Sequence, residues 1–338
     1  MTKDTFYTIE PINWLLRSTA LSNIRRKGID LVESASIIKT FTYIFGFGLI
    51  NTLCLYYKIK SFKGNTKTGI MKFSESVQMT YWYSYLEYVI DLFVVFIFNR
   101  IAYLKYLKAF DHIDSILGTP SYDTIRKKII NITIFCVTIT FANIVFDYIV
   151  WMLVENIRNA LIYSIEYLYI MLNMVTVLDI ISHVIQVEYR LRLVVKVLQV
   201  CFQWWFNRCY LQLLEQVAFI NSTYGCRVFL YRGRIGLLPS VTSTLRALNY
   251  GVIVSVLIYR CEKTYRQSEK ILETIDLLLS RKTNSVETKS DLLEFRNLLI
   301  TRPIRFHAVK FFTMDYTLLV SLSSVVASHT IIMLQNMV

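Results

Sequence analysis

The chain carries none of the short motifs that mark common enzyme sites. Its 338 residues contain no GxxxxGKS or GxxxxGKT phosphate-binding loop, no HExxH zinc motif and no GxSxG nucleophile turn. None of the four histidines has a carboxylate or a cysteine at the spacing of metal ligands. We therefore expect a protein that is not an enzyme and that binds neither a metal nor a cofactor.

The sequence also lacks the marks of a secreted, disulfide-bonded domain. Its six cysteines are scattered and form no CxxC pair, so neither a disulfide framework nor a zinc site is indicated. Asp4, Glu10 and Pro11 precede the first long apolar run. The N-terminus therefore does not have the pattern of a cleaved signal peptide.

Charged residues are few, at 18% of the chain, whereas 54% of the residues are hydrophobic and the mean hydropathy is +0.44. Such a chain is too apolar for an ordinary soluble globule, which indicates a polytopic membrane protein. The formal charge of +13 would suggest a nucleic-acid partner in a soluble protein. In a membrane protein, lysine and arginine instead gather in cytosolic loops, so we expect membrane lipid and no nucleic acid as a partner.

Long apolar runs predict an all-α fold with seven transmembrane helices, in a single membrane domain of residues 1–338. A helix needs about 20 predominantly apolar residues to cross the hydrocarbon core. The residues from 187 to 216 mix aliphatic and charged side chains and predict a helix that leaves the membrane. The clearest predicted spans are residues 40–57, 77–98, 129–154, 161–187 and 311–338.

The remaining two spans fall in a region that is irregular at residues 227–259. The fifth is expected to open near residues 214–230 and the sixth to lie within residues 235–259, but Arg227 and Pro239 interrupt the apolar sequence. The stretch has room for barely one and a half spans of ordinary length. Two interpretations stay open, namely two short and irregular helices or a segment lost from this copy.

Basic residues predict which side of the membrane each loop occupies. With a cytosolic N-terminus, the segments 1–39, 99–128, 188–208 and 260–310 are cytosolic and hold 27 of the 37 lysines and arginines, while the external loops hold 6. This imbalance predicts an external C-terminus after seven crossings. The orientation is opposite to that of a G-protein-coupled receptor, and the chain has no Asn-Pro dipeptide either.

Three segments outside the spans predict amphipathic helices. Residues 1–39 include INWLLRSTAL and the basic cluster around Arg26, and we expect this segment to lie against the membrane surface. In residues 261–280 apolar side chains recur on one helix face, and residues 290–300 form a second such helix. These two cytosolic helices either cover each other or act as an oligomerisation module next to the last span.

Ionisable side chains within the spans are costly in lipid, so they are expected to face the interior of the helix bundle. Several lie beside tyrosine or tryptophan in the predicted outer half of the spans. One interpretation is an interfacial aromatic belt with ordinary packing. The other is a pocket for an uncharged polyol, or for a cationic alkaloid held by cation–π contact. The candidate pocket residues are Tyr83, Glu87, Asp147, Trp151, Tyr163, Glu166 and Tyr167.

The last span, residues 311–338, has a stripe of mostly small and polar side chains. Such a narrow face serves either the close packing of neighbouring helices or the border of an aqueous pore. Steps of three, four, four and three residues place its members on a single helix face, and they are Ser321, Ser324, Ser328, Ile332 and Gln335.

The C-terminal sequence TRPIRFHAVKFFTMDYTLLVSLSSVVASHTIIMLQ, residues 301–335, resembles the signature of the insect gustatory receptor family. In that family a basic cytosolic segment leads into a last helix that ends in Thr-Tyr, five residues and Gln-Phe. Gln335 matches this motif, whereas Ser328, His329 and Asn336 stand at the positions of its Thr, Tyr and Phe.

Residues 110–117 and 261–271 resemble cytosolic segments of the same family. The resemblance implies a tastant-gated cation channel in the plasma membrane, built as a homo- or hetero-tetramer with related receptors around one pore. Ile332 and Gln335 would form its constriction, with Asn336 beside them. The alternative is a non-conducting auxiliary subunit or a degenerate receptor copy. A transporter is disfavoured because no inverted repeat is visible.

Overall fold

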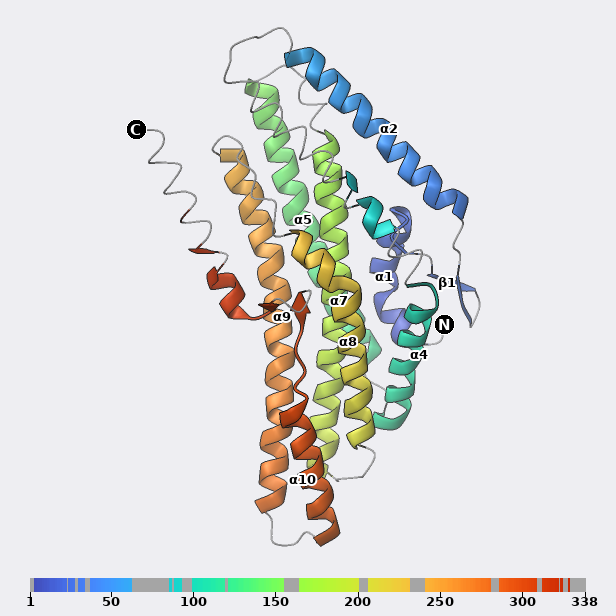
Figure 1. The fold of residues 1–338 in the computed structure, drawn as a ribbon, viewed down its shortest axis with the longest axis vertical. Helices are drawn as coiled ribbons and strands as arrows, with labels where there is room; N and C mark the ends of the chain where they lie inside the picture. The colour runs from blue at the N-terminus through green and yellow to red at the C-terminus, as the bar shows by residue number, and fades with distance from the viewer. Residues whose placement is uncertain are drawn as a thin grey trace. The chain divides into compact units, whose positions relative to one another are not determined.

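The computed structural model consists mainly of α-helices in the part of the chain that it describes (Figure 1), which confirms the predicted all-α class. The described residues are 3–22, 24–27, 30–33, 37–62, 85–86, 88–92, 99–118, 121–154, 164–200, 206–231, 241–280, 286–308, 312–321, 323–324 and 328. The helices are α1 (Thr5–Ser18), α2 (Ile37–Phe62), α4 (Asn99–Leu117), α5 (Tyr122–Val154), α7 (Ser164–Val200), α8 (Phe206–Tyr231), α9 (Val241–Ser280) and α10 (Val286–Thr301). Two antiparallel hairpins pair β1 (Ile24–Lys27) with β2 (Asp30–Glu33) and β3 (His307–Ala308) with β4 (Phe312–Thr313).

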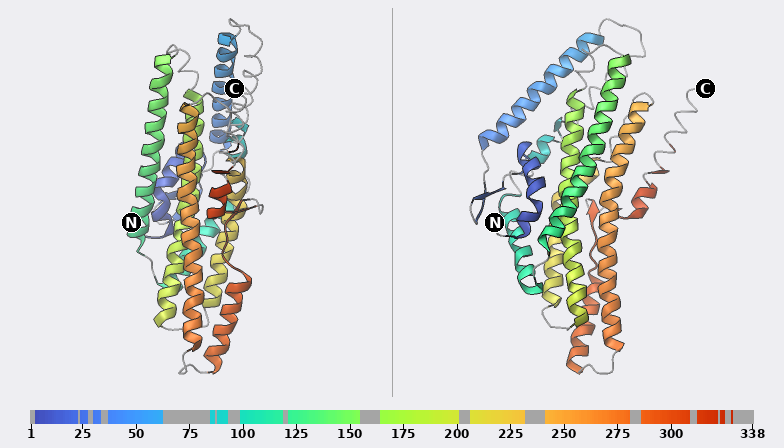
Figure 2. Two further views of the ribbon diagram at one scale, coloured as in Figure 1. Left: turned by 90° about the vertical axis from the view of Figure 1, so that its left-hand side faces the viewer. Right: turned by 180° about the vertical axis from the view of Figure 1, so that it is seen from behind.

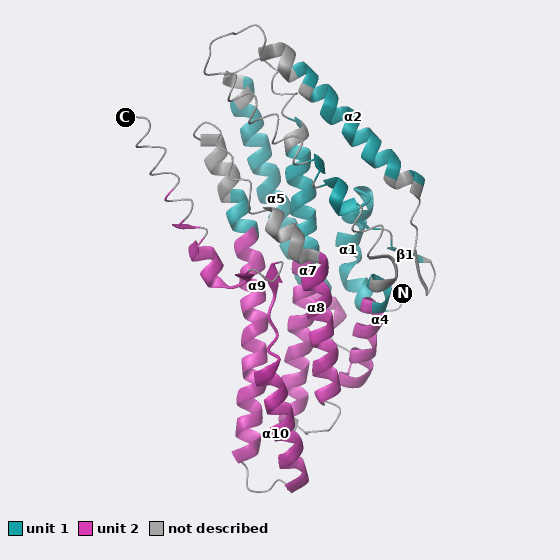
Figure 3. Ribbon diagram, viewed as in Figure 1, with its two compact units in different colours: residues 1–105, 126–179, 230–253 teal, residues 106–125, 180–229, 254–338 magenta. Residues whose placement is uncertain are grey.

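The chain divides into two compact units (Figure 3). Helices α5, α7 and α9 contribute residues to both of them. Each unit is therefore assembled from segments that are far apart in the sequence. Unit 1 comprises residues 1–105, 126–179 and 230–253, and unit 2 comprises residues 106–125, 180–229 and 254–338.

Helix α1 of unit 1 buries its apolar face inside the protein. The helix starts after Asp4, whose side chain accepts a hydrogen bond of 2.9 Å from the backbone N–H of Tyr7. Protein covers the apolar face of α1, although Trp14 on the same helix stays exposed. That residues 1–39 lie against the membrane surface stays a prediction. The buried apolar side chains are Phe6, Ile9, Ile12 and Leu16.

Contacts with basic side chains explain why α1 packs against the protein. The Arg126 guanidinium of α5 donates to the Tyr7 carbonyl at 2.6 Å and to the Glu10 carboxylate at 3.1 Å. It also lies 4.2 Å from the centre of the Tyr7 ring. In β1, Arg26 pairs with the carboxylate of Asp4. Part of the basic cluster is therefore engaged within unit 1.

Helices α2 and α5 present apolar side chains that the protein does not cover. Among the described residues, Tyr122–Val150 in α5 and Tyr167–Gln199 in α7 are long and apolar enough to cross a membrane, and Phe41–Cys54 in α2 is a shorter apolar stretch. Only 17% of the most apolar window of α5 is buried. Exposed rings such as Phe45 and Phe135 are unfavourable in water and suited to hydrocarbon.

A buried arginine joins α4 to α7 in unit 2. The Arg190 guanidinium donates to the two carboxylate oxygens of Asp114 at 2.9 and 2.6 Å, and both side chains are almost fully buried. Tyr122 donates a third hydrogen bond to this carboxylate at 2.9 Å. The Phe110 ring lies 4.0 Å from the guanidinium carbon. Both charges are thus paired where water does not reach them.

Helix α10 and the neighbouring part of α9 lie side by side in unit 2 (Figure 2). The Phe295 ring of α10 meets the Tyr210 ring of α8 at 5.9 Å, and Arg296 donates to Asp276 of α9 at 2.7 Å. The predicted helices over residues 261–280 and 290–300 are confirmed as helices. The buried side chains of α10 are Leu292, Phe295 and Leu299.

Helix α9 differs most from the prediction. It runs without a break over 40 residues, so the predicted sixth span and the first cytosolic helix are one element. It contains no proline, and a change from apolar to charged side chains leaves the backbone hydrogen bonds of a helix intact. Helix α7 continues past the predicted span end at residue 187 to Val200, which agrees with the helix predicted from residue 187 onward, and α8 begins at Phe206.

The last helix begins later than predicted. Phe312 and Thr313 belong to β4, and helical structure starts at Tyr316. Asp315 supplies the reason, because its carboxylate accepts hydrogen bonds from the backbone N–H groups of Thr317 at 3.0 Å and Leu318 at 3.3 Å. A carboxylate in this position marks the start of a helix.

Candidate functional site

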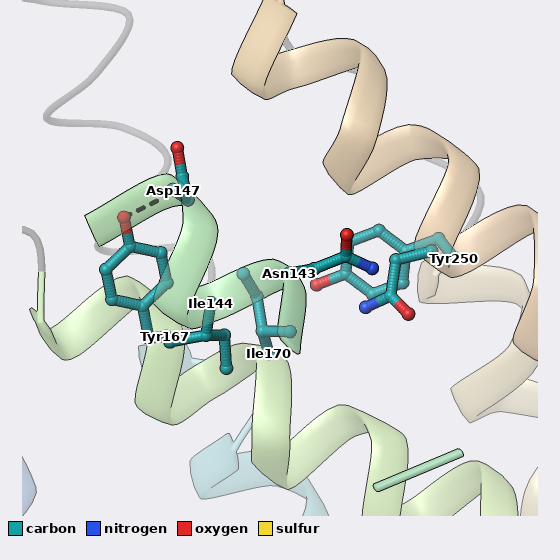
Figure 4. A pocket seen from close by; sticks show the side chains of 7 residues that line it. Asn143, Ile144, Asp147, Tyr167, Ile170 and Tyr250 are labelled. Carbon is teal, nitrogen blue, oxygen red and sulfur yellow. Dashed lines mark hydrogen bonds between the residues drawn. The ribbon is translucent and has the colours of Figure 1, made fainter. Parts of the chain in front are cut away.

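A small hollow in unit 1 gathers polar and aromatic side chains from three helices (Figure 4). Helix α5 contributes residues one helical turn apart, α7 contributes two residues spaced by three, and α9 contributes two neighbours. Apolar helices packed side by side therefore bring a few polar groups together. The lining residues are Asn143, Ile144, Asp147, Tyr167, Ile170, Asn249 and Tyr250.

The most polar part of the hollow is the pair formed by Asp147 and Tyr167. The Tyr167 hydroxyl donates to the Asp147 Oδ2 atom at 2.8 Å, as the dashed line in Figure 4 shows. Both residues are nearly buried, with 3% and 5% of their surface exposed. A buried carboxylate is costly without hydrogen bonds, so the tyrosine offsets part of its desolvation.

A second tyrosine extends this pair. The Tyr148 ring lies 5.6 Å from the Tyr167 ring, with the two planes tilted by 47°. Its hydroxyl shares a hydrogen bond of 2.8 Å with the Ser164 hydroxyl at the start of α7. The buried carboxylate is therefore bonded by one tyrosine hydroxyl, and a second aromatic ring packs on that tyrosine. A carboxylate with aromatic neighbours can bind hydrogen-bond donors or a cation.

On the α9 side, an amide completes the polar lining. Asn249 is 4% exposed, and its Nδ2 atom donates to the Thr140 hydroxyl of α5 at 3.3 Å. Thr140 precedes Asp147 by seven residues and shares its helix face. The contact fixes α9 against α5 and orients the Asn249 amide beside the hollow.

The structure brings two of the seven predicted pocket residues together, Asp147 and Tyr167. Trp151 lies on α5 and Glu166 lies on α7, but the side chains of these two residues are not among those that the structure describes. The other three candidates, Tyr83, Glu87 and Tyr163, lie outside the described residues altogether. The expected burial of charged groups within the spans is confirmed for Asp91, Asp147 and Asp179.

Sequence reasoning missed the other lining residues. Asn143 had a detectable signal, because it is a polar residue one helical turn before Asp147 in an apolar helix. Asn249 and Tyr250 lie in the part of the chain that was expected to be irregular, where no helix face could be assigned. Ile144 and Ile170 have no signal that separates them from other apolar residues.

The predicted pore stripe is described only in part. Ser321, Ser324 and Ser328 are helical and exposed. Ser321 also donates to the carbonyl of Thr317 at 2.9 Å, a hydrogen bond within its own helix. The predicted gate residues Ile332, Gln335 and Asn336 lie outside the described residues.

Comparison with known proteins relates both the sequence and the fold to one class. Residues 217–336 match the family model of the 7tm chemosensory receptors. The structure is similar to that of the insect olfactory receptor OR5 from Machilis hrabei, with a TM-score of 0.61, 12% identity and 97% of each chain covered. The structure of OR5 in complex with eugenol gives a TM-score of 0.57 at 13% identity, again over 97% of each chain. No curated protein sequence matches.

The fold is thus similar to that of an insect olfactory receptor. The matched C-terminal segment includes most of α8, all of α9 and α10, and the start of the last helix. The sequence match over the C-terminal third of the chain and the similarity of the fold both relate this protein to chemosensory receptors.

Proposed function

We propose that this chain is a gustatory receptor, a cation channel that a small tastant opens from the hollow in unit 1. The observation that carries the proposal is the buried pair of Asp147 and Tyr167, set among apolar side chains in a chemosensory-receptor fold. Ligand pockets are typically apolar with a few convergent polar groups, and this hollow has that composition.

The last helix supports the channel part of the proposal. Ser321, Ser324 and Ser328 are exposed in the single chain, so this face is available to border water when copies assemble. Four last helices would surround one pore, with Ile332 and Gln335 at its constriction and Asn336 next to them. The receptor would cross the plasma membrane seven times, with its N-terminus in the cytosol and its C-terminus outside.

Contacts between copies would involve the hairpin of α9 and α10. Leu277, Leu293 and Ile300 on these helices are exposed, with 67%, 49% and 50% of their surface accessible. Large apolar side chains on a predicted cytosolic element favour burial against another protein surface. They support assembly into a homotetramer, or into a hetero-tetramer with related receptors.

The ligand class follows from the polar groups of the hollow. A carboxylate, a phenol hydroxyl and amides suit either an uncharged polyol, bound through hydrogen bonds, or a cationic alkaloid, bound by charge and by aromatic faces. The similar receptor OR5 forms a complex with eugenol, an aromatic ligand without charge. A panel for this chain therefore includes a sugar, an alkaloid cation and eugenol.

The test is to express the full chain alone and record ligand-evoked cation current for this panel. At least one compound is expected to evoke current. For an alkaloid agonist, Asp147→Asn should lower sensitivity by about tenfold or more, because the neutral amide keeps a hydrogen bond but loses the charge. For a polyol, both Asp147→Asn and Tyr167→Phe should weaken the response. The exposed Asp123→Asn at the start of α5 is the matched control.

Lack of current with every compound, from a chain that reaches the cell surface, would contradict the proposal. If current then appeared only on co-expression with a related receptor, the chain would be an auxiliary subunit. If the chain did not reach the surface in either case, the degenerate-copy interpretation would be favoured.

A further inference from the structure

The segment between α10 and the last helix is held by side chains of α8 and α9, all within unit 2. Its described residues are 302–308 and 312–315, and they contain the hairpin of β3 and β4. Across the hairpin, the Met314 N–H donates to the Phe306 carbonyl at 2.9 Å. The segment ends where the last helix begins, so whatever fixes it also fixes the base of that helix.

Tyr265 of α9 is the central contact. Its hydroxyl accepts a hydrogen bond of 2.9 Å from the Phe306 N–H and donates to the Met314 carbonyl at 3.2 Å or to the Phe306 carbonyl at 3.4 Å. The residue is 3% exposed, and its ring stacks on Phe306 with the centres 6.0 Å apart. The guanidinium carbon of Arg305 also lies over the Tyr265 ring, 4.9 Å from its centre.

Burial raises the pKa of Tyr265 well above its ordinary value. The hydroxyl therefore stays protonated across physiological pH and keeps its role as a donor. One group thus bonds the backbone on both sides of the hairpin, at Phe306 before β3 and at Met314 after β4. Such a bridge resists separation of the two strands.

Two further side chains hold the same segment. Asn221 of α8 donates from Nδ2 to the Arg305 carbonyl at 2.9 Å and accepts at Oδ1 from the His307 N–H at 2.9 Å. Glu262, one helical turn before Tyr265 on α9, accepts from the Tyr316 N–H at 3.2 Å. A carboxylate at this first turn also interacts favourably with the positive end of the helix dipole.

We propose that Tyr265, Asn221 and Glu262, here named the clasp, position the base of the last helix and so determine which of its faces turns toward the pore. The proposal rests on the proposed function, in which this helix lines the pore. Tyr316 precedes Ser321 by five residues, or about 7.5 Å along a helix. A rotation of the base by one residue turns every side chain above it by about 100°, which exchanges the serine stripe for another face.

The clasp is a set of positioning residues, because its side chains bind backbone groups of the segment and of the first turn of the last helix. Its effect is on helix orientation, which thiol accessibility measures directly. Ser321, Ser324 and Ser328 lie on the stripe, whereas Ser323 lies on the other side of the same helix. All four are exposed serines, so Ser→Cys replacements at these positions are matched in chemistry and size.

In the test, the full chain carries one of these cysteines, and inside-out membrane vesicles from the expressing cells expose its predicted cytosolic face to a membrane-impermeant cationic methanethiosulfonate. The reagent then reaches the stripe without passing the proposed constriction. Mass spectrometry of the peptide gives the modification rate at each position without replacing the native cysteines. Cysteines on the stripe are expected to react about tenfold faster than Ser323→Cys, because they border water. Tyr265→Phe and Glu262→Met should each reduce this ratio, and the double variant should reduce it about fivefold or more.

Tyr259→Phe is the matched control for the clasp, because Tyr259 is an exposed tyrosine on the same helix. It should leave the ratio unchanged. Asn221→Asp, which keeps the acceptor for the His307 N–H but loses the donor to the Arg305 carbonyl, gives a milder variant should Tyr265→Phe fail to reach the surface.

The outcomes separate the two proposals. A preference for the stripe that survives in the Tyr265→Phe, Glu262→Met double variant would overturn the clasp while leaving the pore assignment in place. Equal reactivity of Ser323→Cys and the stripe cysteines in the parent chain would overturn the pore assignment, and the clasp with it. If the stripe cysteines react faster than Ser323→Cys in the parent chain and lose this advantage only in the clasp variants, both the pore assignment and the clasp are supported.

Discussion

Arg190 shows how a charged residue is kept inside this protein. Its guanidinium makes two hydrogen bonds to Asp114 and lies over the Phe110 ring, with 1% of its side chain exposed. Burial of two charges costs much of what their attraction returns. The net contribution of the intact pair to stability is therefore small, whereas removal of one partner is strongly destabilising because it leaves an unpaired buried charge.

We expect Asp114→Asn to lower the free energy of unfolding by about 3–5 kcal/mol, since it leaves the Arg190 charge buried without a counterion. The double variant Asp114→Leu, Arg190→Met should lose less than this, because neither charge remains. Denaturant unfolding of the detergent-solubilised chain, followed by tryptophan fluorescence, measures both.

The exposed pair of Arg296 and Asp276 supplies the control for this prediction. Its side chains are 36% and 48% exposed, so Asp276→Asn should change stability by less than about 1 kcal/mol. A double variant as unstable as Asp114→Asn alone would contradict the view that the unpaired charge is the cause.

At the scale of elements, the sequence predicted the type of most helices better than their limits. Apolar runs located α2, α5 and α7, because a helix that crosses lipid must be apolar for most of its length. The continuity of α9 was missed, since its charged residues extend the helix without breaking its hydrogen bonds, whereas helical structure beyond residue 187 in α7 was predicted. Asp147 and Tyr167 were found because they are polar groups in apolar spans. Asn249 was not, because it lies in the stretch that was expected to be irregular, and its contact with Thr140 joins residues far apart in the sequence.

Helix α10 offers a test of how an amphipathic element is held. Phe295→Ala should lower the free energy of unfolding by about 3–5 kcal/mol, because the ring is fully buried and meets Tyr210. Leu293→Ala on the exposed face of the same helix should cost much less. Denaturant unfolding and amide hydrogen exchange over α10 measure these effects, and equal losses in the two variants would show that α10 is not docked through Phe295.

At the scale of the whole molecule, the predicted orientation depends on the excess of lysine and arginine in segments assigned to the cytosol. Many of these residues lie in residues 260–310, which form the end of α9, α10 and the start of the clasped segment. Basic segments are retained on the cytosolic side during membrane insertion. The similarity to a solved receptor shows the fold, so the direction of insertion is a separate property to be measured.

We expect an epitope tag at the C-terminus to bind antibody on intact cells, and one at the N-terminus to bind only after permeabilisation. The expected difference in signal is about tenfold or more for each tag, because antibodies do not cross a membrane. A cytosolic marker protein controls for leakage. A C-terminal tag that is accessible only after permeabilisation would contradict the external C-terminus and the pore direction built on it.

The two hydrogen bonds of Asn221 also have a consequence for glycosylation. Asn221, Ser222 and Thr223 form an acceptor sequence for N-linked sugars. The amide nitrogen that would carry the sugar already donates to the Arg305 carbonyl, and the amide oxygen accepts from the His307 N–H. An oligosaccharide would replace one hydrogen of this amide nitrogen, so it would compete directly with the contact to the Arg305 carbonyl.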